Sequence, residues 1–78
     1  HNYIPPNSKL EKSLCKIFAQ ILDIEEGKIS VNDNFFQIGG NSLLAIKLTY
    51  KINSKFKCNI QIVDIFTHNT IRDLALYL

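Results

Sequence analysis

The stretch Gly39-Gly40-Asn41-Ser42 holds the residues best suited to chemistry, because it places a hydroxyl directly after two glycines. Apolar residues at helical spacing follow, so a helix is predicted to begin at Asn41 or Ser42. The first N–H groups of a helix have no partner inside it, and the helix dipole makes that end positive. A serine there can carry a phosphate, and the glycines leave no Cβ to crowd the approach. The alternative is that Ser42 only caps the helix.

The longer segment around this serine resembles the attachment motif of thiolation domains, the peptidyl carrier proteins of nonribosomal peptide synthetases. The family pattern is approximately D-x-F-F-x-L-G-G-x-S-L. The positions that match it are Asp33, Phe35, Phe36, Ile38 (for Leu), Gly39, Gly40, Ser42 and Leu43. Asn41 departs from the His or Asp that is usual before the serine. Tyr3-Ile4-Pro5-Pro6 looks like a linker from an adenylation domain, and residues 65–71 resemble the family's short third helix and the start of its fourth.

This resemblance implies a specific function. A phosphopantetheinyl transferase would attach 4′-phosphopantetheine from coenzyme A to Ser42 Oγ, with local support from Gly39, Gly40 and Asn41. The thiol of this arm would hold an aminoacyl or peptidyl group as a thioester. The domain would be non-catalytic and would shuttle its cargo between adenylation, condensation and thioesterase or tailoring domains. Because the tether makes each encounter intramolecular, weak docking is enough. We expect a cytoplasmic domain that is monomeric in isolation.

Helical periodicity predicts the elements that position Ser42. Ser8 and Glu11 form a capping box at the start of a first amphipathic helix, which should fade near residues 23–26, with Gly27 as a stop signal. A second helix should span residues 42–56, a short one about 63–67, and a last one should start at 69–70, where Thr70 resembles a cap. The prediction is an all-α four-helix bundle with three main helices, a short third helix and a long packed loop between the first two. The family resemblance implies that this bundle is of the acyl-carrier-protein kind. Residues 1–7 would be a linker or tag remnant, and residues 8–78 the carrier domain.

The second predicted helix has two apolar faces. At 3.6 residues per turn, one arc faces the core; its members are Leu44, Ala45, Leu48, Ile52 and Phe56. Leu43, Ile46 and Tyr50 lie on the other side, and we call them the apolar strip. An exposed strip beside Ser42 would dock partners, together with Lys47. The alternative is that some of its members pack under the long loop or the third helix.

The row of Lys47, Lys51 and Lys55 has a simpler interpretation as a solvated face. The same helix contains no acidic residue, whereas carriers of fatty-acid synthesis are typically acidic there. Within the family resemblance, this favours a synthetase thiolation domain.

The core should consist of the apolar residues on the inner helix faces. We expect burial of Leu14, Phe18, Ile21, Leu44, Leu48, Ile52, Phe66, Ile71 and Leu74. Phe35 and Phe36 should pin the long loop to that core.

Composition and charge argue against nucleic-acid binding, a membrane span and a metal site. The chain has 78 residues, which is one small domain, and a net charge of +2, which is too mild to indicate nucleic-acid binding. No apolar run reaches the roughly 18 residues of a membrane span. We expect Cys15 and Cys58 to be reduced thiols. Together with His1 and His68, they lack the spacing of metal ligands.

Three rival functions remain to be weighed. A serine hydrolase would need a second glycine where Leu44 stands, and an α/β sheet that does not fit the length. A DNA-binding module would need a basic recognition helix, and the lysines here alternate with core residues. A helical interaction module is the serious alternative, since it differs only in leaving Ser42 unmodified.

Overall fold

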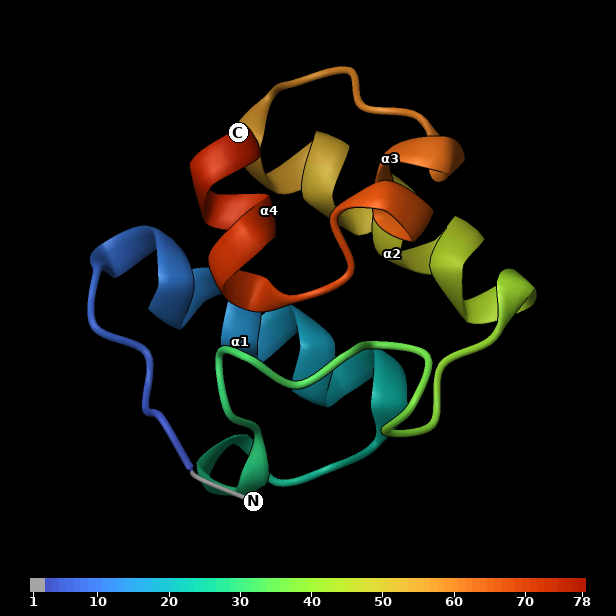
Figure 1. The fold of residues 1–78 in the computed structure, drawn as a ribbon. Coiled ribbons are helices and arrows are strands. Elements are labelled where there is room, and N and C mark those ends of the chain that lie inside the picture. Colours follow the sequence, from blue (N-terminus) through green and yellow to red (C-terminus); the bar gives the residue numbers. More distant parts are fainter. Residues whose placement is uncertain (1–2) are drawn as a thin grey trace.

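The computed structural model describes residues 3–78, and these residues form helices joined by loops, with no strand among them (Figure 1). The two long helices are α1 (Lys9–Leu22) and α2 (Ser42–Phe56). Two short helices follow, α3 (Ile62–Thr67) and α4 (Ile71–Tyr77). A 3-10 turn, η1 (Glu26–Lys28), interrupts the connection from α1 to α2. The predicted all-α bundle with a short third helix is confirmed.

Local sequence chemistry sets the bounds of α1. The hydroxyl of Ser8 accepts a hydrogen bond from the Glu11 amide at 3.1 Å, and Glu11 Oε1 accepts one from the Asn7 amide at 2.8 Å. The helix ends at Asp23, which adopts the left-handed conformation with φ 57°. Gly27 is therefore not the terminator that we predicted, because it lies in η1, after the helix has ended.

The long connection between α1 and α2 is packed, as predicted. Ile29, Val31 and Phe35 on this loop are fully buried. Main-chain hydrogen bonds fix it to the end of the chain: the Phe35 amide donates to the Asn69 carbonyl at 2.8 Å, and the Arg72 amide donates to Val31 at 3.1 Å. A loop held in this way gives α2 a fixed starting point.

The predicted linker also contacts this loop. The Ile4 amide donates to Ser30 Oγ at 3.0 Å, and the Val31 amide donates to the Ile4 carbonyl at 2.9 Å. His1 and Asn2, the first residues of that predicted segment, lie outside the described residues.

Most of the predicted core is confirmed. Six of the expected residues are fully buried: Leu14, Phe18, Leu48, Ile52, Ile71 and Leu74. Ile21 and Leu44 are half-buried at the edge of this cluster. The prediction for Phe66 is wrong, since 46% of it is exposed, and its neighbour Ile65 is fully buried instead. In a helix, one residue step turns the side chain by about 100°, which exchanges the inner and outer faces.

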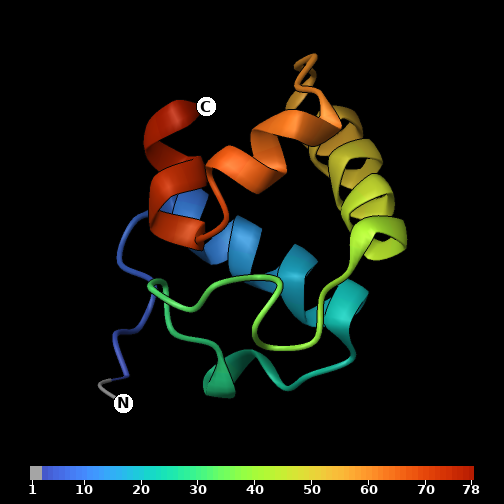
Figure 2. The same ribbon diagram turned by 45° about the vertical axis from the view of Figure 1, so that its right-hand side comes forward.

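Each short helix packs against one of the two long helices. Helix α1 contacts both α2 and α4, and α3 packs against α2. Figure 2 shows α3 spanning the space between α2 and α4. No helix among residues 3–78 is long and apolar enough to cross a membrane.

Candidate functional site

The start of α2 presents Ser42 as its first helical residue. Asn41 is the N-cap, and its Oδ1 accepts a hydrogen bond from the Leu44 amide at 2.9 Å. The Asn41 carbonyl accepts the next bond, from the Ala45 amide at 2.8 Å. The alternative in which Ser42 serves as the cap is therefore wrong. Asn and Ser cap helices about equally well, so the sequence could not decide between these adjacent positions.

The Ser42 hydroxyl is available for modification. Ser42 is exposed, and its side chain makes no hydrogen bond within residues 3–78. Across the same residues, the amides of Ser42 and Leu43 likewise have no acceptor. The first turn of α2 holds no acidic side chain that would offset the positive end of the helix dipole. These donors fit a phosphodiester on Ser42 Oγ.

The two glycines before the site serve the turn that leads into α2. Gly39 has φ +124°, a conformation that L side chains rarely adopt. A Cβ on Gly40 would lie 2.5 Å from ring atoms of Phe35, and the Gly40 amide donates to the Phe35 carbonyl at 2.9 Å. The sequence suggested that these glycines clear the approach to Ser42. The structure adds that Gly40 lets the loop close tightly over Phe35. That the glycines clear the approach to Ser42 stays a prediction.

The motif's two phenylalanines connect the core to α3. Phe35 packs edge-on against Phe18 and Phe36, with ring centroids 5.3 Å and 5.2 Å apart. Phe36 in turn stacks on Phe66 of α3 at 4.7 Å. Phe35 is the deeper of the pair, since it is fully buried and Phe36 is half-buried. The loop before Ser42 is thus held by an aromatic chain that ends on α3.

The apolar strip lies on the surface. The exposed fractions are 63% for Leu43, 55% for Ile46 and 75% for Tyr50, and Lys47 between them is exposed as well. The alternative in which these residues pack under the loop or α3 is wrong. Helix α3 adds Val63 and Phe66, which are 56% and 46% exposed. Neither exposure was predicted, although the i, i+3 spacing of residues 63 and 66 places both on one face of a helix.

His68 and the cysteines lie apart from this chemistry. His68 stacks on Tyr77 with ring centroids 4.2 Å apart, and its Nδ1 lies 3.2 Å from Asp73 Oδ1. Cys15 and Cys58 are free thiols. Burial, with a smaller effect of the Glu26 carboxylate, raises the pKa of the Cys15 thiol. Within residues 3–78, no three His, Cys, Asp or Glu side chains gather in a group that could hold a metal ion.

A family match decides what this arrangement is. Residues 12–78 match the model of the family described as "Phosphopantetheine attachment site". The chain belongs to this family. The cofactor of the family is the 4′-phosphopantetheine expected from the motif, and the chain is a carrier domain.

The curated relatives are much longer proteins. Over 73 residues, which are 94% of its length, the carrier domain is 44% identical to nonribosomal peptide synthetase kk1B of Curvularia clavata. The share of that synthetase covered by these residues rounds to 0%. Over 76 residues, which are 97% of its length, the carrier domain is 42% identical to bacitracin synthase 2 of Bacillus licheniformis. These residues cover 3% of that synthase. The chain thus spans 3% or less of these relatives.

Solved structures show the same fold. The carrier domain resembles a chain in the complex of the phosphopantetheine transferase Sfp with coenzyme A and a peptidyl carrier protein. The TM-score is 0.90 at 31% identity, covering 96% of this chain and 95% of that one. The solution structure of an active-site mutant peptidyl carrier protein gives 0.90 at 30% identity, covering 99% and 83%. The chain is therefore a carrier domain of the peptidyl carrier type.

Proposed function

We propose that this chain is the thiolation domain of a nonribosomal peptide synthetase and that Ser42 is its attachment residue. The observation that carries the proposal is the exposed, unbonded hydroxyl of Ser42 at the first position of α2, with the capping done by Asn41. When attached, the arm supplies a thiol that holds an aminoacyl or peptidyl group as a thioester. The relatives that are synthetases support this assignment.

The chain's own residues present Ser42 and stabilise the charge of the linkage. Gly39 and Gly40 shape the turn, and Asn41 starts the helix so that the amides of Ser42 and Leu43 stay free for a phosphate oxygen. We propose that the domain is itself non-catalytic. A hydrolase would need a base hydrogen-bonded to the serine, whereas the Ser42 hydroxyl makes no hydrogen bond within residues 3–78. A cytoplasmic location and a monomeric state stay predictions.

The test is the intact mass after incubation with coenzyme A and a promiscuous phosphopantetheinyl transferase. We expect the wild type to gain one phosphopantetheine and Ser42→Ala to gain none. Ser54→Ala is the matched control, because Ser54 is also an exposed serine of α2, and it should be modified like the wild type. A folded wild type that gains no mass would leave only the helical interaction module.

The proposed docking surface for partner domains is the apolar strip with Lys47, extended by Val63 and Phe66 of α3. The partners would be the transferase and the adenylation, condensation and thioesterase or tailoring domains. The neighbour solved with a transferase supports the first of these. A strip next to Ser42 would bring the serine to each partner's active site by covering a small apolar area.

This surface is tested by charged substitutions that leave the core alone. Leu43→Asp and Ile46→Asp should slow phosphopantetheine transfer by about tenfold or more, because each buries a charge in the docked complex. Leu76→Asp on α4 is the control, since Leu76 is 82% exposed and lies outside the strip. Equal transfer rates for all three variants and the wild type would remove the strip from the proposal.

A further inference from the structure

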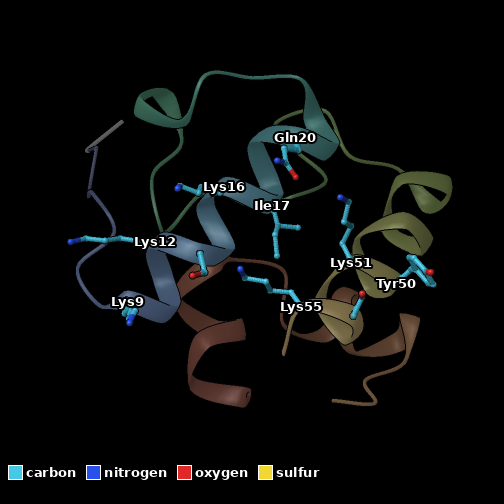
Figure 3. Close-up of a pocket in the computed structure, with 10 residues that line it drawn as sticks. Lys9, Lys12, Lys16, Ile17, Gln20, Tyr50, Lys51 and Lys55 are labelled. Carbon is cyan, nitrogen blue, oxygen red and sulfur yellow. The ribbon is translucent and has the colours of Figure 1, made fainter. Parts of the chain in front are cut away.

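A second surface lies between α1 and α2, and it is a groove of about 500 Å³. Ile17, which is buried, forms part of its floor, and Tyr50 lies on its border with the apolar strip. Figure 3 shows Ile17 pointing into this space from α1, with Lys51 and Lys55 extending over it from α2. Apart from Tyr50, the groove shares no residue with the surface that we propose for partner docking.

The groove gathers positive charge. Its lining includes five lysines and no acidic residue; these are Lys9, Lys12, Lys16, Lys51 and Lys55. The whole chain has nine basic side chains and a net charge of only +2, so more than half of its cations lie here. None of the five pairs with a carboxylate within the described residues 3–78. The groove is therefore a cationic surface without internal neutralisation.

The lysines come from both sides, or rims, of the groove, and between them lie the buried Ile17 and the polar residues Ser13, Gln20 and Ser54. Figure 3 shows the side chains of Lys12 and Lys16 extending outward on the α1 side, opposite those of Lys51 and Lys55. Lysine stems are long and flexible, so ammonium groups of both rims can reach a ligand lying over Ile17. From Lys9 to Gln20 the α1 rim measures about 16 Å, at 1.5 Å per helical residue. This length and pattern fit a short amphipathic helix with an apolar stripe between two rows of carboxylates.

We propose that the α1–α2 groove binds an acidic amphipathic helical segment of a partner polypeptide. Nucleic acid fits less well, because the groove contains no arginine and only one aromatic residue on which a base could stack. An anionic membrane fits less well too, because the surface is concave and its one aliphatic lining residue, Ile17, is buried. Lys51 is nine residues from Ser42, about 14 Å along α2. A segment in the groove would therefore hold the carrier domain without covering the start of α2.

The experiment uses a synthetic peptide of about four helical turns as the probe. It carries leucines at i, i+3 and i+7 spacing with glutamates on both flanks, and a second peptide replaces each glutamate by glutamine. Backbone amide shifts of the isotope-labelled chain are followed by NMR during each titration. We expect saturable shifts at the amides of α1 and α2 that line the groove. Replacing Glu by Gln should weaken the affinity by about tenfold, because paired charges are lost.

Charge-matched variants decide whether the groove itself is responsible. Lys16→Glu combined with Lys51→Glu alters one lysine on each rim. Lys28→Glu combined with Lys57→Glu alters two exposed lysines outside the groove and changes the net charge equally. The first pair should abolish peptide binding, and the second should leave the dissociation constant within about twofold, since distant surface charges are screened. Thermal melts confirm that both variants are folded.

Three results would overturn the inference. They are the absence of groove shifts with the acidic peptide, an equal loss of binding in both variants, and tighter binding of phosphatidylserine vesicles or duplex DNA than of the peptide. The inference does not depend on modification of Ser42. The mass gain of the Lys16→Glu, Lys51→Glu variant reports the proposed function separately, so the two can fail independently.

Discussion

At the scale of single residues, neighbouring residues of the site have different structural roles. Asn41 caps α2, Gly40 lets the chain pass over Phe35, and Ser42 is left with an unbonded hydroxyl. The sequence motif predicted which residues gather at this point. It could not predict which residue caps α2 and which allows the close approach to Phe35, because both roles depend on the folded backbone.

Gly40 offers the sharpest test of this local packing. Gly40→Ala should lower the free energy of unfolding by about 1–3 kcal/mol, because its Cβ would overlap the Phe35 ring at 2.5 Å. Urea unfolding measures the change. Gly27→Ala is the control, since nothing lies within 4 Å of its added Cβ, and it should be neutral or slightly stabilising. Similar losses in both variants would contradict the role given to Gly40.

The caps can be separated by single substitutions at adjacent positions. Asn41→Ala should cost about 1 kcal/mol of stability, because the Leu44 amide loses its acceptor, whereas Asn41→Asp should keep the cap. Ser42→Ala should change stability by no more than about 0.5 kcal/mol, as at other exposed sites. A larger loss for Ser42→Ala than for Asn41→Ala, measured by thermal melting, would reverse the assignment.

At the scale of elements, the positions of all four helices were predictable, but the rotation of the short helix α3 was not. The bounds of α2 and the capping residue of α1 follow from local periodicity and from Ser8. Helix α3 has six residues, too few for periodicity to fix its rotation. The core therefore contains Ile65, whereas we predicted Phe66 at this place. Two tertiary contacts fix the orientation of α3. Phe66 stacks on Phe36, and Asp64 accepts a hydrogen bond from Tyr77 of α4.

The stability that the hydrogen bond between Tyr77 and Asp64 contributes depends on pH. The Tyr77 hydroxyl donates to Asp64 Oδ1 at 2.9 Å, and this hydrogen bond is the main reason that the pKa of Tyr77 is raised. A raised pKa in the folded state means that the stabilisation is complete below the ordinary tyrosine pKa of about 10 and is lost as pH rises further. Tyr77→Phe should therefore lower the melting temperature at neutral pH, and the difference should shrink above pH 10.

The control for this pair is another tyrosine. Tyr50→Phe removes a hydroxyl that has no hydrogen-bond partner in the described part of the chain, so its melting temperature should follow the wild type at every pH. If the Tyr77→Phe difference were independent of pH, the hydrogen bond to Asp64 would not be its cause.

At the scale of the whole molecule, α2 serves two opposite environments. Its inner face is part of the core, and its outer face carries the apolar strip beside Ser42. The sequence predicted both faces because each repeats at helical spacing. The cationic groove was not predictable in this way, because its lysines come from two separate segments that only the packing of α1 against α2 brings together.

Two leucines of α2 test this two-sided arrangement. Leu48→Ala should lower the free energy of unfolding by about 2–5 kcal/mol, because Leu48 is fully buried and the truncation leaves a cavity. Leu43→Ala deletes the same atoms from the exposed strip and should cost no more than about 0.5 kcal/mol. Comparable losses in the two variants, measured by denaturant unfolding, would mean that the faces of α2 are wrongly assigned.

The most direct test of the central claim is to locate the modification in the chain. After incubation with coenzyme A and a phosphopantetheinyl transferase, the chain would be digested and its peptides sequenced by tandem mass spectrometry. We predict that phosphopantetheine is found on Ser42 and on no other serine. A modified chain whose phosphopantetheine lies on another residue, or a folded chain that carries none, would contradict the account.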